Sequence, residues 1–271
     1  MNRRKMAVAG QFYPSDAEEI ISLIADYNQI LDAHFKEDDS VLKLKPRAVV
    51  VPHAGYVYSG FTANTALRLL CNAEVNRIVV IGPSHRVYLK GTSISEFSSY
   101  ETPLGSLSID KTLVSELKER FGFKFFPEAH QEHSTEVQMP FIKYYKEDVS
   151  VVELVYGDEN PENLAEVIEY LLEDLETVVV ISTDLSHYYD IQKAKSLDTI
   201  CLDAVKKLSS SELHQGCEAC GKIGVEAMLI AAKKKGLRSI LLDYRTSADA
   251  SGDESQVVGY MSAAFIANDG L

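Results

Sequence analysis

The stretch Ala48-Val49-Val50-Val51-Pro52-His53-Ala54-Gly55-Tyr56 joins a short apolar run to a polar turn that carries a histidine. A continuous run of apolar residues is typical of a strand that helices cover on both faces. Three further apolar runs also end in a polar turn, two of them with a histidine. These are 78–81, followed by Gly82-Pro83-Ser84-His85; 178–181, followed by Ser182-Thr183-Asp184-Leu185-Ser186-His187; and 240–242, followed by Asp243 to Asp249. The repeat predicts a sheet whose strands end at one polar edge.

Helical segments alternate with these strands and with two more, at 151–155 and 257–266, the last of which we expect to be antiparallel. A first helix is predicted after Ser15, which forms a capping box with Glu18. Further helices are predicted at 61–70, at 161–173 after Asn160, and at 223–234. Residues 91–109 carry Pro103 and Gly105 and predict a hairpin beside the sheet. Such alternation indicates a single α/β domain over 1–271, with three layers and a mainly parallel central sheet covered by helices.

The acidic composition argues against some classes of binding partner. The 271 residues carry a formal net charge of −13, which argues against a nucleic-acid or anionic membrane surface, because both need a basic patch. No apolar stretch approaches the roughly 20 residues of a membrane span, and the N-terminus lacks the apolar run of a signal peptide. We therefore expect a cytoplasmic protein.

The four cysteines suggest little chemistry at this stage. Cys71 and Cys201 lie in helix-like contexts and are predicted to be buried thiols. Cys217 and Cys220 form one CxxC pair, which lacks the second pair or the histidines of a structural zinc site. We take this spacing as coincidental, with a redox pair as the alternative.

Three of the seven histidines follow predicted strands, and ligands of open α/β sheets bind at the carboxyl ends of the strands. If the strands are neighbours, the three imidazoles share one cleft. Two histidines and a carboxylate are a recurring ligand set for iron(II), zinc, copper or nickel. The predicted ligands are His53 and His85, with Asp184, Asp249 or His187 completing the set. The alternative is that each histidine only caps a helix or binds a carbonyl group.

A second histidine cluster lies at 128–136. His133 precedes a predicted helix, where it can bind an anion or act as an acid or base. His130, with His34 and His214, is expected at the surface. Near His53, two tyrosines are predicted to contact a ligand at the cleft mouth, with simple packing as the alternative. These are Tyr56 and Tyr58.

The segments quoted above, together with Ala9-Gly10-Gln11-Phe12-Tyr13-Pro14, Tyr100-Glu101-Thr102-Pro103-Leu104-Gly105 and Glu132-His133-Ser134, resemble the signatures of the Memo-like proteins. The resemblance implies a fold like that of class III extradiol dioxygenases, which use non-haem iron(II), two histidines and a carboxylate. It implies that His53 and His85 are metal ligands and that His187, beside Asp184, is the acid/base, with His133 as a further cleft histidine.

The same resemblance implies several properties of the animal relatives. These have been associated with cell motility, with phosphotyrosine peptides and with copper or iron, and they carry a cleft cysteine in place of the acidic ligand. We find no cysteine at 244–253, where that ligand is expected, so Asp249 or Asp253 is predicted to supply a carboxylate. Radical-SAM and AMMECR-like proteins are the partners that microbial relatives imply.

Two functions therefore remain in view. The first is a metal-dependent enzyme with redox or dioxygenase-like chemistry. The second is a module that binds a small molecule or peptide without catalysis, because a fold does not fix a function. A metal-free hydrolase that uses Asp184 and His187 ranks last, since no nucleophile elbow is present.

Overall fold

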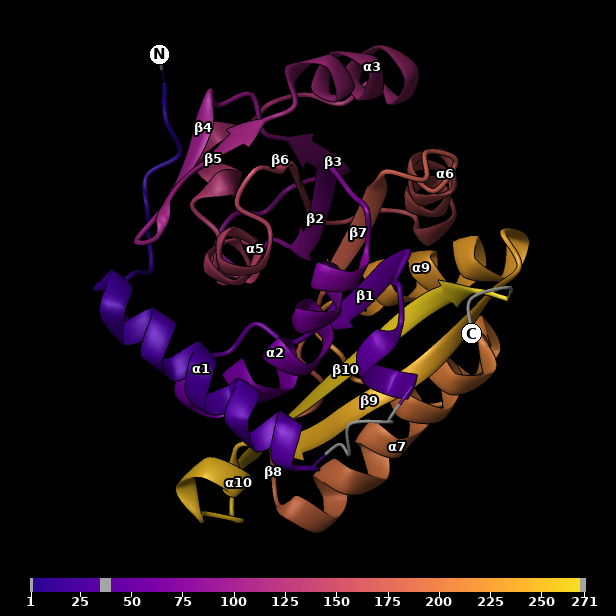
Figure 1. Cartoon of the computed structure of the whole chain (residues 1–271). Coiled ribbons are helices and arrows are strands. Elements are labelled where there is room, and N and C mark those ends of the chain that lie inside the picture. The colour runs from indigo at the N-terminus through magenta and orange to yellow at the C-terminus, as the bar shows by residue number, and fades with distance from the viewer. Residues whose placement is uncertain (1, 35–39, 269–271) are drawn as a thin grey trace.

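The computed structural model describes residues 2–34 and 40–268 and shows a large mixed sheet between layers of helices (Figure 1). Within these residues, ten strands form the sheet, in the order β4-β5-β6-β2-β7-β1-β10-β8, with β3 paired to β6 and β9 paired to β10. The strands are β1 (Ala48–Val51), β2 (Arg77–Pro83), β3 (Thr92–Ile94), β4 (Ser99–Thr102), β5 (Gly105–Ile109), β6 (Ser150–Tyr156), β7 (Thr177–Ser182), β8 (His187–Tyr189), β9 (Leu237–Thr246) and β10 (Val257–Ala267).

The centre of the sheet is parallel, and its margins are antiparallel. Strands β5, β6, β2, β7 and β1 run parallel to one another, whereas β3, β4, β9 and β10 each pair antiparallel with a neighbour. The apolar runs of β1 and β2 are fully buried, as the sequence pattern predicts. The expected α/β fold is confirmed, and it agrees with the dioxygenase-like architecture that the resemblance implies.

Helices cover both faces of this sheet. On one side lie α1 (Ala17–His34), α2 (Phe61–Leu67) and α5 (Met139–Tyr145), and on the other lie α6 (Pro161–Leu171), α7 (Ile191–Lys207) and α9 (Lys222–Lys234) (Figure 1). The remaining helices are η1 (Ser40–Lys43), η2 (Tyr56–Gly60), η3 (Arg68–Asn72), α3 (Lys111–Phe121), η4 (Pro127–His130), α4 (His133–Glu136), α8 (Ser210–Leu213) and α10 (Ala248–Ser251). Among the described helices, none combines the length and the apolarity needed to cross a membrane.

Two details of the predicted elements are wrong. The N-terminus of α1 is capped by Asp16, whose Oδ1 accepts hydrogen bonds from the backbone of Glu18 and Glu19, so the Ser15–Glu18 box does not form. The run 240–242 belongs to β9, which pairs antiparallel with β10 and is half-buried. It is therefore not a buried strand with a parallel neighbour, although β9 still ends at the same edge as β1, because β10 runs antiparallel to both strands. The predicted cap of α6 is confirmed, since Asn160 Oδ1 accepts a hydrogen bond from Glu162.

Candidate metal centre

The parallel strands β2, β7 and β1 lie side by side, and each ends in a residue of the predicted cleft. His53 follows β1, Asp184 follows β7 and His85 follows β2. The imidazole rings of His53 and His85 are 5.1 Å apart between centroids. His133, at the first turn of α4, lies 5.4 Å from His53 and 4.7 Å from His85. Three histidines from separate segments therefore meet at one sheet edge. The strand pattern predicts His53 and His85 there, whereas His133 comes from the start of a helix.

The hydrogen bonds around His53 fix its tautomer. The hydroxyl of Ser182 donates its one hydrogen to the carbonyl of Ser134 and accepts from Gln138 at 3.1 Å. The contact of 3.0 Å between Ser182 Oγ and His53 Nδ1 must then be donated by the imidazole. Nε2 of His53 is left with its lone pair, which is the form that binds a metal.

Glu132 orients the other two imidazoles in a similar way. Its Oε1 lies 3.2 Å from Nδ1 of His85 and 2.7 Å from Nδ1 of His133, the latter without hydrogen-bond geometry. Its Oε2 accepts the backbone N–H of His85 at 2.6 Å. Burial would raise the pKa of Glu132, but the bonds from His133 and His85 outweigh it and hold the pKa far below its usual range. A charged carboxylate behind two imidazoles is the outer support that metal-binding histidines use.

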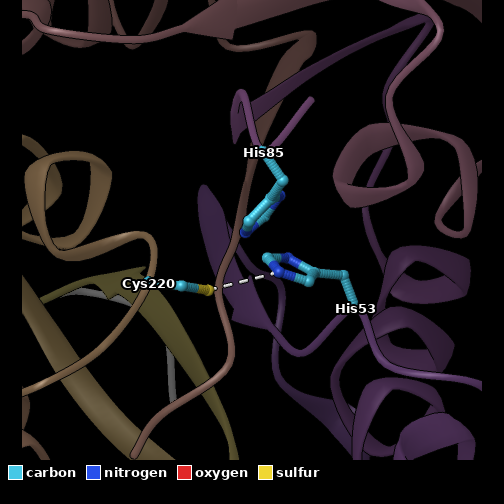
Figure 2. A group of neighbouring side chains, drawn as sticks. All are labelled: His53, His85 and Cys220. Carbon is cyan, nitrogen blue, oxygen red and sulfur yellow. Dashed lines mark hydrogen bonds between the residues drawn. The ribbon is translucent and has the colours of Figure 1, made fainter. Parts of the chain in front are cut away.

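The third donor is Cys220, which the sequence reading left without a role. Its Sγ lies 3.2 Å from Nε2 of His53, and Figure 2 shows it facing His53 and His85 across the cleft. The backbone N–H of Asp184 also points to this sulfur, at 3.2 Å. The expectation that this cleft contains no cysteine is therefore wrong. The thiol comes from the turn before α9, outside the region 244–253 in which we sought it.

The cleft contains two groups of side chains that could hold a metal ion. In one, donor atoms of His53, His85 and Cys220 lie within 4.8 Å of one another, and in the other, those of His85, Glu132 and His133 do so. Both Nδ1 atoms of the second group face Glu132, so that carboxylate supports the two imidazoles, and the first group is the one that could hold a metal ion with its outer donor atoms. Two imidazoles and a thiolate suit zinc, iron or copper and leave open positions for a ligand.

Burial keeps His53 and Cys220 uncharged when no cation is present. Burial, with the neighbouring His85 and His133, places the pKa of His53 well below its ordinary value. Burial and the nearby Asp184 raise the pKa of Cys220 to about 12. A neutral imidazole is ready to bind a metal, whereas the thiol must lose its proton as the metal binds. Burial also raises the pKa of Asp184, although a hydrogen bond from His53 and the nearby His187 oppose that shift.

The remaining predicted residues are divided between the cleft and other places. His187 lies in β8, half-buried, and its electrostatic interaction with His53 and Asp184 places it beside the cluster. Asp184 is buried and accepts the backbone N–H of His53 at 2.7 Å, so it supports the turn. Asp249 is not in either donor group of the described chain, because its carboxylate closes a turn with Thr246 at 2.7 Å. The predicted ligand role of Asp249 finds no support in this geometry.

The two tyrosines near His53 differ in environment. Tyr56 is buried, donates a hydrogen bond to the carbonyl of Val137 and stacks on Phe141, so the packing alternative holds for it and the ligand-binding prediction does not. Tyr58 is 46 % exposed and interacts electrostatically with Tyr260, as Asp184 does. The ligand-binding role of Tyr58 stays a prediction.

His130 is completely buried, which contradicts the expected surface position. Its Nδ1 lies 2.8 Å from Glu153 Oε2, and its Nε2 lies 2.8 Å from Ser93 Oγ. Burial would raise the pKa of Glu153, but His130 and Arg4 outweigh it and hold the pKa below its usual value. This pair belongs to the core beneath α4 and not to the cleft. His214 is exposed, as expected, and binds Glu226.

Replacing Glu153 with glutamine should lower the free energy of unfolding by about 3–5 kcal/mol at pH 7, because it removes the buried carboxylate that His130 contacts and that interacts electrostatically with Arg4. The depressed pKa means that Glu153 stabilises the fold above the pKa of an unfolded glutamate, about 4.3, and that this contribution is lost as the pH falls through the folded value. Urea unfolding at several pH values should therefore show the difference between wild type and variant shrinking in acid. Equal stability at pH 7 would contradict this role of Glu153.

The other cysteines also depart from the prediction. Cys201 and Cys217 form a disulfide in the core, so Cys201 is buried but is not a free thiol. Cys71 is an exposed free thiol rather than a buried one. The CxxC pair is thus divided, with Cys217 in a structural bond and Cys220 in the cleft.

The fold and the cleft together define a class: a layered α/β protein with a strand-end cluster of histidines and one cysteine whose donor atoms could hold a metal ion. The Memo-like protein family model matches residues 4–264. The chain belongs to the Memo-like family. The relatives include MEMO1 family proteins from Archaeoglobus fulgidus, 35% identical over 97% of this chain and 99% of the relative, and from Thermoplasma volcanium, 36% identical over 96% and 97%.

A solved structure supports the fold independently. An uncharacterized protein, JW3007 of Escherichia coli K12, superposes with a TM-score of 0.56 at 13% identity, covering 80% of this chain and 99% of that one. At this identity the likeness concerns the fold alone.

Proposed function

We propose that this protein binds a transition-metal ion, iron or copper, through His53, His85 and Cys220, and that the bound metal serves redox chemistry on a small molecule. The observation that carries the proposal is the convergence of two imidazoles and a thiol, with donor atoms within 4.8 Å, from three separate segments. A bound iron or copper ion would supply one-electron chemistry and open positions for a ligand.

The residues of the chain have distinct parts in this proposal. Ser182 and Glu132 hold His53 and His85 in the tautomers that present Nε2. No hydrogen bond within the described residues occupies Nε2 of His133, so this nitrogen is free to take or release a proton beside the metal. His187 is the second candidate for acid/base work, next to Asp184. General acids and bases of this kind operate best when their pKa lies near the working pH.

Anaerobic loading with iron(II), followed by metal analysis, tests the proposal. We expect about one ion per chain in the wild type and almost none in His53→Ala or His85→Ala. His214→Ala is the matched control, because the His214 side chain is 59 % exposed, contacts Glu226, and belongs to neither donor group among the described residues. Unchanged metal content in the two cleft variants would remove His53 and His85 as ligands.

A binding module without catalysis is the second candidate, and the exposed aromatic rim favours it. Tyr58 is 46 % exposed and Tyr188 is 72 % exposed, and both interact electrostatically with Tyr260 beside the cleft. Exposed tyrosines offer apolar area and a hydroxyl to a small molecule or peptide. A ligand that binds equally well before and after chelation of the metal would favour this function over the first.

A further inference from the structure

The turn that carries Cys220 is held in place at two points. It spans 214–221, between α8 and α9. At its end, the backbone N–H groups of Cys220 and Gly221 donate to Asp184 O at 3.2 Å and to Thr183 Oγ1 at 2.9 Å. At its middle, Cys217 is bonded covalently to Cys201 of α7. The disulfide at Cys217 and the hydrogen bond at Cys220 therefore hold the turn at two positions that are three residues apart.

The contact with Thr183 leaves no room for the turn to shift inward. A Cβ atom on Gly221 would lie 2.6 Å from the Cβ of Thr183 and 2.8 Å from the carbonyl oxygen of Ser182. The backbone is therefore pressed against the end of β7. Movement of the turn toward β7 is therefore blocked, and the disulfide at Cys217 restrains the turn at a second point.

The disulfide connects the turn to a rigid body. Cys201 is 1 % exposed and Cys217 is 4 % exposed, and both belong to the main hydrophobic core. Helix α7 packs on β9 and β10, which extend from the same sheet as the cleft. The bond closes a segment of 16 residues that contains the short helix α8, so it removes conformational freedom from the chain just before Cys220.

We infer that the Cys201–Cys217 disulfide positions Cys220, so that the redox state of this pair sets the metal affinity of the cleft. The inference rests on the proposed metal function and deepens it. Reduction breaks the S–S bond, takes up two electrons and two protons, and leaves two thiols. With a phosphine reductant, the phosphine supplies the electrons and becomes the oxide, and water supplies the protons and the oxygen. The turn then keeps only its hydrogen bonds to Thr183 and Asp184, and Cys220 spends less time within reach of a metal at His53 and His85.

The expected loss of affinity is about ten- to a hundredfold, which is typical when the groups that support a metal ligand are removed. Cobalt(II) is the probe, because a thiolate–cobalt bond gives its own charge-transfer absorption. The affinity is measured for oxidised wild type, for wild type reduced with a phosphine and desalted under argon, and for Cys201→Val/Cys217→Ala with and without the same reduction. We expect weaker binding and a weaker charge-transfer band in the reduced wild type and in the double variant, and no further effect of reduction on the double variant.

Two results would overturn the inference. One is cobalt affinity within twofold of the oxidised wild type in either disulfide-free form that keeps its circular dichroism spectrum. The other is alkylation of Cys201 and Cys217 as free thiols in the untreated protein. If the double variant fails to fold, the cobalt affinity of the reduced wild type is compared with that of the oxidised wild type. If the reduced wild type also unfolds, the single variant Cys201→Ser is compared instead.

The proposed function is judged separately in the same experiment. If oxidised wild type shows no thiolate–cobalt band, Cys220 is not a ligand and the proposed metal site fails. If the band is present and unaffected by loss of the disulfide, only the positioning role fails.

Discussion

Replacing Cys220 with serine should weaken the binding of zinc(II) by more than about 100-fold. The loss of an outer supporting residue alone typically costs about 10- to 100-fold, and Cys220 is placed to bind the ion itself, 3.2 Å from the Nε2 atom of His53. A serine hydroxyl has nearly the same size but keeps its proton and is a poor ligand for soft metals. The fold should be unaffected, because the half-buried serine can keep the hydrogen bond from the N–H of Asp184.

Competition against a chelator of known affinity measures this effect. Cys71→Ser is the matched control, because Cys71 is the exposed free cysteine of the described chain and lies outside the cleft. It should bind zinc as the wild type does. Equal affinities for the Cys220 and Cys71 variants would exclude the thiol as a ligand.

Replacing Arg4 with methionine should lower the free energy of unfolding by about 3–5 kcal/mol, because it leaves a buried carboxylate without its counter-charge. Arg4 lies 2.8 Å from Glu136, and both side chains are almost fully buried. Glu136 also accepts hydrogen bonds from the backbone of Ala7 and Val8 and from the hydroxyl of Tyr13. These contacts hold the N-terminal segment 4–13 against α4, the helix that carries His133.

The neighbouring residue offers a matched control for urea unfolding. Arg3 is 64 % exposed and contacts Glu101 only at 3.8 Å, so Arg3→Met should cost less than about 1 kcal/mol. The double variant Arg4→Met/Glu136→Gln should recover part of the loss, because the uncompensated charge is gone. Equal costs at positions 3 and 4 would show that the buried pair does not stabilise the fold.

The central strands could be predicted because their complete burial is visible in a few consecutive residues of the sequence. Every residue of β1 and β7 is buried on both faces, so each strand appears in the sequence as an uninterrupted apolar run. The run 240–242 looks the same but lies in β9, at an edge and half-buried. A short apolar run does not show whether its neighbour will be parallel or antiparallel, since that depends on where β10 returns along the chain.

The metal centre could be predicted only in part, for a similar reason. His53 follows β1 and His85 follows β2, and only β7 lies between these two strands in the sheet. Their position directly after a strand was therefore enough to predict that they meet. Cys220 meets His53 across a sequence separation of 167 residues, from a turn with no strand pattern before it. His130 was misplaced because its buried partner, Glu153, lies in the middle of β6, where the surrounding run is otherwise apolar.

The most direct measurement is an anomalous-scattering map of the cleft, from crystals of protein purified without added metal and then loaded anaerobically with iron(II). We expect one peak within bonding distance of Nε2 of His53, a nitrogen of His85 and Sγ of Cys220, with His133 and His187 beside it. A cleft without a peak after loading, or an ion bound elsewhere in the molecule, would contradict the proposed metal site.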